Sequence, residues 1–457
     1  MDTTKTHAPM RKGLADVDLI HGPIFKSLLL FAVPIFVSNL FQLLYNTVDT
    51  MIVGNVLGDV SLAAIGACGS IYELLVGFGQ GIGNGLAIVA ARAYGAQDEA
   101  LLKRTVAGSI VIGAISSALI TILGSIALHP LLQLLDTPEE IIEEAYSYIS
   151  VIAWFVVVMF AYNLCAALLR AISNSVMPLV FLVFSSCLNV VLDLIFIARL
   201  GMGVQGAAVA TVLSQGVSVL LCLLYIYKRT PLLIPSREHF VPDRSLYTDL
   251  IGQGLSMGFM SSIVSAGSVI LQYGINGLGT LVIAGHTAAR KLFTFTAMPV
   301  MSLSMAASTF VSQNRGADQP KRIRQGLRQC YIFSFAIAAV ITLAMVVGAH
   351  WLVQLISGSS EPIVLENGAR YLQWNAPFYS VLGVLLTTRY ALQSLGQKVL
   401  PLVSSVIEFA GKVVFVLVFI PRFEYNAVIL CEPVIWCLMA IQLVFTYMHD
   451  PYMKKAK

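Results

Sequence analysis

A carboxylate stands inside one of the most apolar stretches of this chain, LNVVLDLIFIARLGMGVQGAAVAT, which begins at Leu188. The acid is Asp193, and Asn189 lies four residues before it, so the two side chains share one face if the stretch is helical. An ionised group in such a segment is costly unless it has partners, and by default it marks a functional site. Carboxylate and amide oxygens suit a proton or a hard cation.

A second polar face precedes it in the chain. It consists of Asn39, Gln42, Asn46 and Asp49, which follow a spacing of three to four residues on an otherwise apolar run that also contains Pro34. This spacing predicts a polar stripe along one helix. The alternative is that Asp49 lies at the water interface, because the polar segment Asn55–Asp59 follows soon after it.

Three further groups of ionisable residues fall within apolar runs. Glu73 precedes the glycine-rich stretch GFGQGIGNG and either faces a cavity or points outward. Glu408 and Lys412 are four residues apart, which predicts an ion pair, with a cavity contact that transmits motion as the alternative. Arg290 and Lys291 are adjacent, so they point about 100° apart on a helix.

The composition of the chain predicts that the elements which carry these residues belong to a membrane protein. The chain of 457 residues is 57% hydrophobic and 11% charged, whereas soluble chains carry about 25% charged residues. Nearly charge-free runs recur from end to end, which indicates an all-α polytopic fold. We expect twelve transmembrane helices, centred near residues 38, 76, 116, 158, 188, 216, 263, 300, 337, 380, 410 and 437.

The other segments argue against several classes of protein. The first 23 residues lack the features of a signal peptide, so we expect the first span to be retained. The seven cysteines nearly all lie in apolar runs without metal-ligand spacing, and we expect them to pack as small apolar side chains. We expect no cofactor, no ATP-binding loop and no enzymatic activity.

The basic residues predict the orientation. With both termini on one side of the membrane, that side receives nearly all Lys and Arg of the loops, and the other side receives only Arg199, Arg370 and Arg422. The bias predicts cytoplasmic termini and an even number of spans. A nucleic-acid partner is not expected, because the basic residues are spread over every second loop.

The two halves of the chain are related by an internal repeat. YGAQDEALLKR from Tyr94 parallels RGADQPKRIRQ from Arg315, and two further segment pairs match at the same offset of 221–223 residues. With an even number of spans in each half, the pseudo-axis runs along the membrane normal and the site is expected between or within the halves. The acids are confined to the first half, since Asp193 corresponds to Val416 and Asn189 to Lys412, while Asp49 aligns near Ile270.

The predicted organisation follows from the repeat and from the one long polar connector near the middle of the chain. It comprises a cytoplasmic N-terminal tail (1–23), a first lobe of six helices (24–228), a cytoplasmic linker (229–246), a second lobe of six helices (247–448) and a cytoplasmic C-terminal tail (449–457).

With these segments in hand, the chain resembles the MATE (multidrug and toxic compound extrusion) family of prokaryotes, over almost its whole length. The most specific segments are NLFQLLYNTVDTMIVGNVLGDVSLAAIG, the LLR that ends at Arg170, and LNVVLDLIFIARLGMGVQGAAVAT. The resemblance implies two pseudo-symmetric six-helix lobes around a V-shaped cavity. It also implies antiport, in which cationic or amphipathic drugs leave by alternating access as Na⁺ or H⁺ flows in.

The resemblance further implies a cation site in the first lobe. Asp49 and Asp193 match the acids of helices one and five that bind the coupling ion. If this ion is Na⁺, the two acids are its metal ligands. Asn189 matches the neighbouring amide, Asn163 an amide of helix four and Thr211 a hydroxyl of helix six. The chain departs from one relative at Ala166, where that relative has a polar residue in helix four, and it has no clear match to the acidic pair of the second lobe in another branch.

A mechanism follows as a hypothesis. Two neighbouring buried carboxylates favour one shared proton, and the same oxygens suit Na⁺, so the choice of ion stays open. Cation influx would neutralise the pair, rearrange the first helix around Pro34 and lower the affinity for the drug. Side chains expected to contribute to the substrate cavity or to gating are Glu73, Asn46, Pro34, Glu408, Lys412 and Arg290.

The alternative functions are a flippase for lipid-linked precursors and a dedicated metabolite exporter of the same superfamily. A flippase would be expected to have a strongly cationic cavity, whereas the acids Asp49, Glu73 and Asp193 favour cationic substrates. The expected partners are a small-molecule substrate and the lipid bilayer, with the chain acting as a monomer in a bacterial inner membrane.

Overall fold

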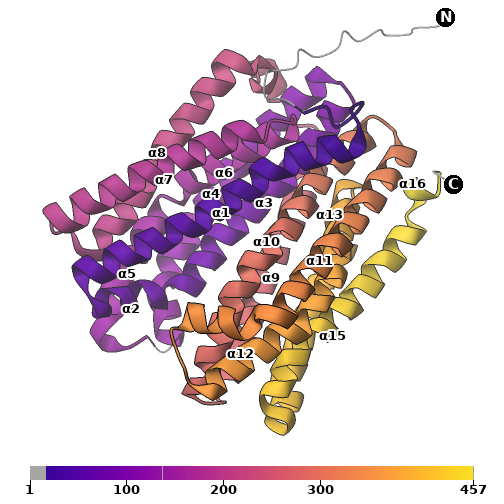
Figure 1. Cartoon of the computed structure of the whole chain (residues 1–457). Coiled ribbons are helices and arrows are strands. Elements are labelled where there is room, and N and C mark those ends of the chain that lie inside the picture. Colours follow the sequence, from indigo (N-terminus) through magenta and orange to yellow (C-terminus); the bar gives the residue numbers. More distant parts are fainter. Residues whose placement is uncertain (1–16, 136, 456–457) are drawn as a thin grey trace, which may run out of the picture. The chain divides into compact units, whose positions relative to one another are not determined.

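The computed structural model describes residues 17–135 and 137–455 of the chain. The described part is almost entirely helical and contains no strand, which confirms the predicted all-α fold (Figure 1). Residues 1–16, 136 and 456–457 lie outside the described part, and with them most of the predicted N-terminal tail and the end of the predicted C-terminal tail.

The chain forms two compact units. The first unit comprises residues 1–258 and 309–319, and the second comprises residues 259–308 and 320–457. Two long helices, α9 (Arg244–Asn276) and α10 (Thr280–Gly316), have residues in both units. The first unit also contains α1 (Ile24–Leu57), α2 (Asp59–Ala67), α3 (Gly69–Gly95), α4 (Glu99–Leu134), α5 (Glu139–Trp154), α6 (Val156–Ala171), α7 (Val176–Asp193) and α8 (Gly203–Arg229). The second unit also contains α11 (Pro320–Ser357), α12 (Pro362–Asn375), α13 (Tyr379–Ser394), α14 (Val399–Val414), α15 (Ile420–His449) and α16 (Pro451–Lys454).

Most of these helices can cross a membrane. In the described residues, nine helical stretches are long and apolar enough, and α5 with α6 forms a further span bent by 50°. One of the nine, Val399–His449, contains both α14 and α15, and a kink with φ of 50° lies at Glu424. Counting this stretch as two spans, and α12 with α13 as one, gives the twelve spans that the sequence predicts.

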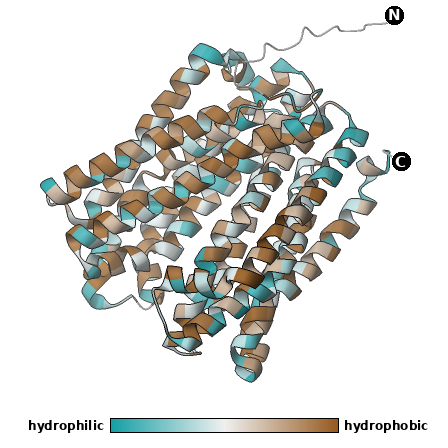
Figure 2. Ribbon diagram, in the orientation of Figure 1, coloured by the Kyte–Doolittle hydropathy of each residue, from teal (hydrophilic) through white to brown (hydrophobic). Residues whose placement is uncertain are grey.

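The outer surface explains why these sequences form helices in a membrane. Large apolar side chains such as Ile126, Leu220, Val347 and Ile441 are exposed, and hydrophobic residues run along the helices in Figure 2. Lipid is the solvent that such a surface requires, and a helix satisfies its own backbone hydrogen bonds there. Inside each unit, apolar side chains from several helices pack into buried clusters.

The internal repeat is visible in the structure because helix breaks and π-helical turns occur at equivalent positions of the two halves. The turn between α5 and α6 at Phe155 corresponds to the turn Ala376–Phe378 between α12 and α13. A π-helical turn, Leu194–Arg199, follows α7, and a second one, Phe415–Phe419, follows α14. Such π turns are uncommon in proteins, and those that do occur are often found at functional sites. The first of them begins directly after Asp193.

A close helix contact in the first unit obeys the same repeat. A Cβ atom on Gly95 of α3 would lie 2.0 Å from the backbone oxygen of Gln313 on α10, and one on Gly316 would lie 2.0 Å from the backbone oxygen of Arg92. Gly95 and Gly316 are repeat equivalents, and so are Arg92 and Gln313. The two helix ends therefore meet in a reciprocal contact that requires glycine on both sides.

Candidate functional site

Helices α1 and α7 bring the two acids of the first unit together. The helices pack against each other, and the carboxyl groups of Asp49 and Asp193 lie within hydrogen-bonding distance. Asp193 is completely buried, whereas Asp49 is half-buried. Two carboxyl groups in contact require a proton or a cation between them, because two bare charges would repel each other in a medium of low dielectric constant.

Asn189 and Thr211 form the inner wall of this site. The side-chain amide of Asn189, one turn before Asp193, donates from Nδ2 to Asp193 Oδ2 at 2.8 Å and accepts at Oδ1 from the backbone N–H of Thr211 at 3.2 Å. The Thr211 hydroxyl donates to the Ala207 carbonyl oxygen at 3.0 Å. It therefore accepts from the Tyr45 hydroxyl, which lies 3.4 Å away.

Two of the carboxyl oxygens lack a hydrogen-bond partner. Oδ1 of Asp49 and Oδ1 of Asp193 are buried and have no hydrogen-bond partner among the described residues. Buried polar atoms are nearly always bonded, so these two oxygens fit a proton or a hard cation. Carboxylate oxygens match a hard cation such as Na⁺ better than a soft transition metal.

Three tyrosines near Asp49 were not predicted as site residues. Tyr45 on α1, Tyr72 on α3 and Tyr148 on α5 all lie within electrostatic reach of the Asp49 carboxyl group. In the sequence a tyrosine in an apolar run is indistinguishable from a packing residue, so only the fold reveals that these three tyrosines lie near Asp49.

The remaining predicted residues of the first unit lie elsewhere. The Asn163 amide donates to the Met159 carbonyl oxygen of its own helix at 2.9 Å, and the exposed Asn46 accepts from Gln42 at 3.3 Å. Pro34 lies within α1, which continues through it, and Glu73 is exposed on α3. The described hydrogen bonds of these residues do not connect them to the carboxyl pair.

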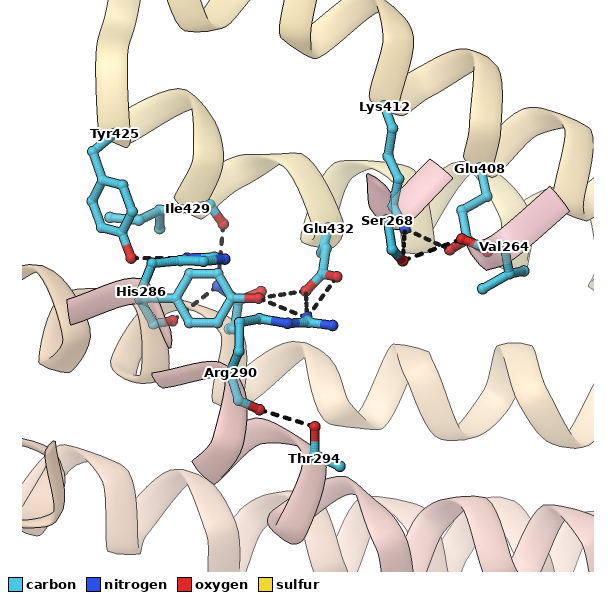
Figure 3. Close-up of polar contacts among 12 residues, drawn as sticks. Val264, Ser268, His286, Arg290, Thr294, Glu408, Lys412, Tyr425, Ile429 and Glu432 are labelled. Atoms are coloured by element: carbon cyan, nitrogen blue, oxygen red, sulfur yellow. Dashed lines mark hydrogen bonds and ion pairs between the residues drawn. The ribbon is translucent and has the colours of Figure 1, made fainter. Parts of the chain in front are cut away.

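The predicted residues of the second unit belong to two ion pairs. Lys412 Nζ lies 2.9 Å from Glu408 Oε1, as their spacing predicts, and 3.4 Å from the Ser268 hydroxyl. Arg290 Nη1 lies 2.8 Å from Oε1 of Glu432, a residue that the sequence analysis missed (Figure 3). Glu432 stands in the apolar run AVILCEPVIW, so its sequence context marks it as a functional candidate in the same way as that of Asp193. Lys291 is exposed.

One short motif in α9 has no catalytic context. Residues 254–258 read GLSMG and match the nucleophile pattern GxSxG. They lie inside the continuous helix Arg244–Asn276, whereas the nucleophile of that pattern requires a sharp turn between a strand and a helix. The pattern therefore does not indicate a hydrolase here.

Comparison with protein families gives a match to MatE over residues 34–195 and again over residues 257–418. The two matches begin 223 residues apart, which confirms the internal repeat seen in the sequence. Together they cover more than half of the chain.

Individual relatives agree with this match. A probable multidrug resistance protein of Bacillus subtilis, YpnP, is 28% identical over 86% of this chain and 87% of its own length. A second from the same species, YoeA, is 26% identical over 95% of both chains. The multidrug export protein MepA of Staphylococcus saprophyticus is 23% identical over 82% of both chains.

Solved structures share the fold. One of them is the outward-facing conformation of a multidrug resistance MATE family transporter of the MOP superfamily. It matches with a TM-score of 0.89 and 22% identity, over 98% of this chain and 100% of that chain. A MATE structure in the bent conformation matches with a TM-score of 0.87 and 22% identity, over 97% of this chain and 99% of that one.

Proposed function

Since this chain belongs to the MatE family of multidrug efflux transporters, we propose that it exports cationic or amphipathic compounds in exchange for Na⁺ or H⁺. The observation that carries the proposal is the contact between Asp49 and Asp193 inside an apolar unit. A buried carboxyl pair with two unpartnered oxygens has its lowest free energy when a proton or cation lies on it. The relatives that are named as multidrug export proteins support the export of drugs.

The coupling ion is held by the carboxyl groups of two helices, Asp49 on α1 and Asp193 on α7. Asn189 on α7 binds the Asp193 carboxyl group and is itself fixed by the backbone N–H of Thr211 on α8. An ion or proton on the pair removes the repulsion between the carboxylates and lets α1 and α7 stay packed. Its release leaves two charges that favour separation of the helices or the approach of a cationic drug. A bound cation thus lowers the affinity of the protein for the drug, and a bound drug lowers its affinity for the cation, as antiport requires.

The first helix has a structural weak point through which this change can act. Proline has no N–H group, so Pro34 cannot donate a hydrogen bond to the preceding turn of α1. Helices bend most easily where such a bond is missing. We propose that occupancy of Asp49, four turns further along, changes the bend of α1 at Pro34.

The proposed orientation places both termini in the cytoplasm of a bacterial inner membrane, with the chain working as a monomer. The support is the excess of Lys and Arg in every second loop, since loops with few basic residues are the ones that are translocated.

The proposal is tested by efflux of ethidium and norfloxacin from proteoliposomes under separately imposed Na⁺ and H⁺ gradients. We expect one gradient to drive export by the wild-type chain, and Asp49→Asn and Asp193→Asn each to abolish gradient-driven export while the protein stays inserted. Asp59→Asn, an exposed acid at the start of α2, is the matched control and should export normally. Full gradient-driven export by Asp193→Asn would disprove the assignment.

A further inference from the structure

A groove of about 560 Å³ lies between α14 and α15 in the second unit. Its apolar walls are formed by Leu400 and Val403 of α14 and by Ile441 and Phe445 of α15. All four side chains are exposed, and those of Ile441 and Phe445 are 68% and 64% exposed. Because the stretch that contains both helices is apolar enough to cross a membrane, the open side of the groove meets lipid rather than water.

The groove becomes polar at the ends of the two helices. Gln397 directly precedes α14, and Thr446 and His449 belong to the last turn of α15, which Asp450 follows. His449 lies eight residues after Ile441, so the polar end and the apolar walls are about 12 Å apart along the helix axis. A groove with one polar and one apolar end fits an amphipathic molecule that lies along the helices.

The carboxylate in the groove lining, Asp450, already has partners. Its Oδ1 accepts from the backbone N–H groups of Tyr452 at 3.0 Å and Met453 at 3.2 Å. Its Oδ2 accepts from Gln397 Nε2 at 2.9 Å. Asp450 is only 4% exposed. Its charge therefore stabilises the turn between α15 and α16, and little of it faces a ligand in the groove.

Basic residues outnumber acidic ones around the polar end. The charged residues of segments 397–403 and 441–455 are Lys398, Asp450, Lys454 and Lys455. Three lysines less one aspartate give a formal net charge of +2, with histidine neutral. Arg324 of α11 lies at the same end, because its Nη2 donates to a backbone carbonyl oxygen of α16 at 3.3 Å. Basic pockets between membrane helices on the cytoplasmic side are typical sites for anionic lipid headgroups.

We propose that this groove binds one anionic phospholipid, with an acyl chain between α14 and α15 and the phosphate at the basic end. The proposed orientation of the chain places this end in the cytoplasmic leaflet. A soluble anion would leave the apolar walls uncovered, and a zwitterionic lipid would gain less from the excess of positive charge. The inference goes beyond export and does not depend on which compound or ion the chain carries.

The test uses a tryptophan in the groove wall as a reporter for brominated lipid. Phe445→Trp is reconstituted into phosphatidylcholine vesicles that contain either dibrominated phosphatidylglycerol or dibrominated phosphatidylcholine. The signal of the wild type, which has four tryptophans, is subtracted. Bromine quenches a tryptophan that it contacts, so the ratio of quenching gives the preference for the anionic lipid. We expect a preference of about 5-fold or more, the effect of one or more basic residues near the headgroup.

Leu224→Trp is the matched control for general attraction of anionic lipid to a basic surface. Leu224 is exposed near the end of α8, whose last two residues are Lys228 and Arg229, and it does not line the groove. Its preference for brominated phosphatidylglycerol should be smaller, at about 2-fold or less. Lys398→Gln with Lys454→Gln, made in Phe445→Trp, should lower the preference to this level.

Two variants of α14 test the groove itself in the Phe445→Trp chain. Val403→Phe narrows the groove and should reduce quenching by brominated phosphatidylglycerol. Val406→Phe is the matched control, because Val406 is exposed on the same helix but does not line the groove, and its quenching should be unchanged. If the double lysine variant does not insert, the two valine variants still decide the question.

Three outcomes overturn the inference. Equal preferences in Phe445→Trp and Leu224→Trp would show that only the general surface charge attracts the lipid. Equal quenching of Phe445→Trp by the two brominated lipids would show that the groove does not select an anionic headgroup. No quenching of Phe445→Trp by either lipid would show that a protein surface, such as a second copy of this chain, covers the groove.

Discussion

At the scale of single residues, a hydrogen bond from Asn189 stabilises the buried carboxyl group of Asp193. Asp193 is completely buried, and its Oδ2 accepts a hydrogen bond from the Asn189 amide at 2.8 Å. The same amide is fixed by the backbone N–H of Thr211. A carboxylate that loses such a charge-assisted bond is less stable as a bare anion, and it therefore binds a proton or cation more strongly.

Asn189→Ala should therefore strengthen cation binding without removing either acid. A hydrogen bond to a charged group contributes about 1.5–3 kcal/mol, so the Na⁺ or H⁺ concentration for half-maximal export should fall roughly 10-fold or more. The measurement is ethidium efflux from proteoliposomes as a function of the driving-ion concentration.

Asn163→Ala provides the comparison for this variant. The Asn163 amide is bonded to the Met159 carbonyl oxygen of its own helix, and its removal should change the half-maximal ion concentration much less. A larger effect at Asn163 than at Asn189 would contradict the arrangement described for the site.

The limits of the sequence are clearest at this scale. A carboxylate in an apolar run is visible by itself, which is why Asp193 was singled out and why Glu432 could have been. Asp49, Asn163 and Thr211 were assigned through a family resemblance, because no spacing in the sequence relates them to Asp193. Tyr45, Tyr72 and Tyr148 come from three helices, and only the packing of α1, α3 and α5 brings them to Asp49.

At the scale of helices, the reciprocal contact of α3 and α10 depends on two glycines. A Cβ atom at Gly95 would lie 2.0 Å from a backbone oxygen of Gln313, which cannot turn away as a flexible side chain would. Gly95→Ala and Gly316→Ala should each destabilise the protein by about 1–3 kcal/mol, the usual cost of overpacking. Each variant should thus lower the midpoint of thermal unfolding in detergent.

Gly77→Ala is the control on the same helix, because nothing lies within 4 Å of a Cβ atom at that position. Its unfolding midpoint should be equal to that of the wild type or slightly higher, since alanine favours a helix more than glycine by about 1 kcal/mol. Equal midpoints for Gly95→Ala and Gly77→Ala would show that α3 and α10 do not meet in this way.

The helix pattern was predictable to different degrees. Long apolar runs such as Ile24–Leu57 and Pro320–Ser357 predict their own spans. The sequence does not show the bend of 50° at Phe155 or the π turn Leu194–Arg199, because each of these depends on packing. The repeat nevertheless extends to these features, because the π turns after α7 and α14 occur at corresponding positions.

At the scale of the whole molecule, the distribution of basic residues predicts which loops face the cytoplasm. Glu238 lies in the polar connector between α8 and α9, and Ser360 lies in the loop between α11 and α12. Both are exposed.

In a chain in which the exposed Cys187 is replaced by serine, Ser360→Cys should react with a membrane-impermeant maleimide in intact cells. Glu238→Cys should react only after permeabilisation, and the reverse pattern would contradict the orientation.

The central claim is that the pair of Asp49 and Asp193 carries the ion that drives export. It is tested most directly by measuring the flux of Na⁺ and of H⁺ that accompanies ethidium movement in the same proteoliposomes. The wild-type chain should move one of these ions in a fixed ratio to ethidium, and Asp193→Asn should move ethidium, if at all, with no accompanying ion. An unchanged ratio of ion to ethidium in Asp193→Asn would show that the coupling ion binds elsewhere.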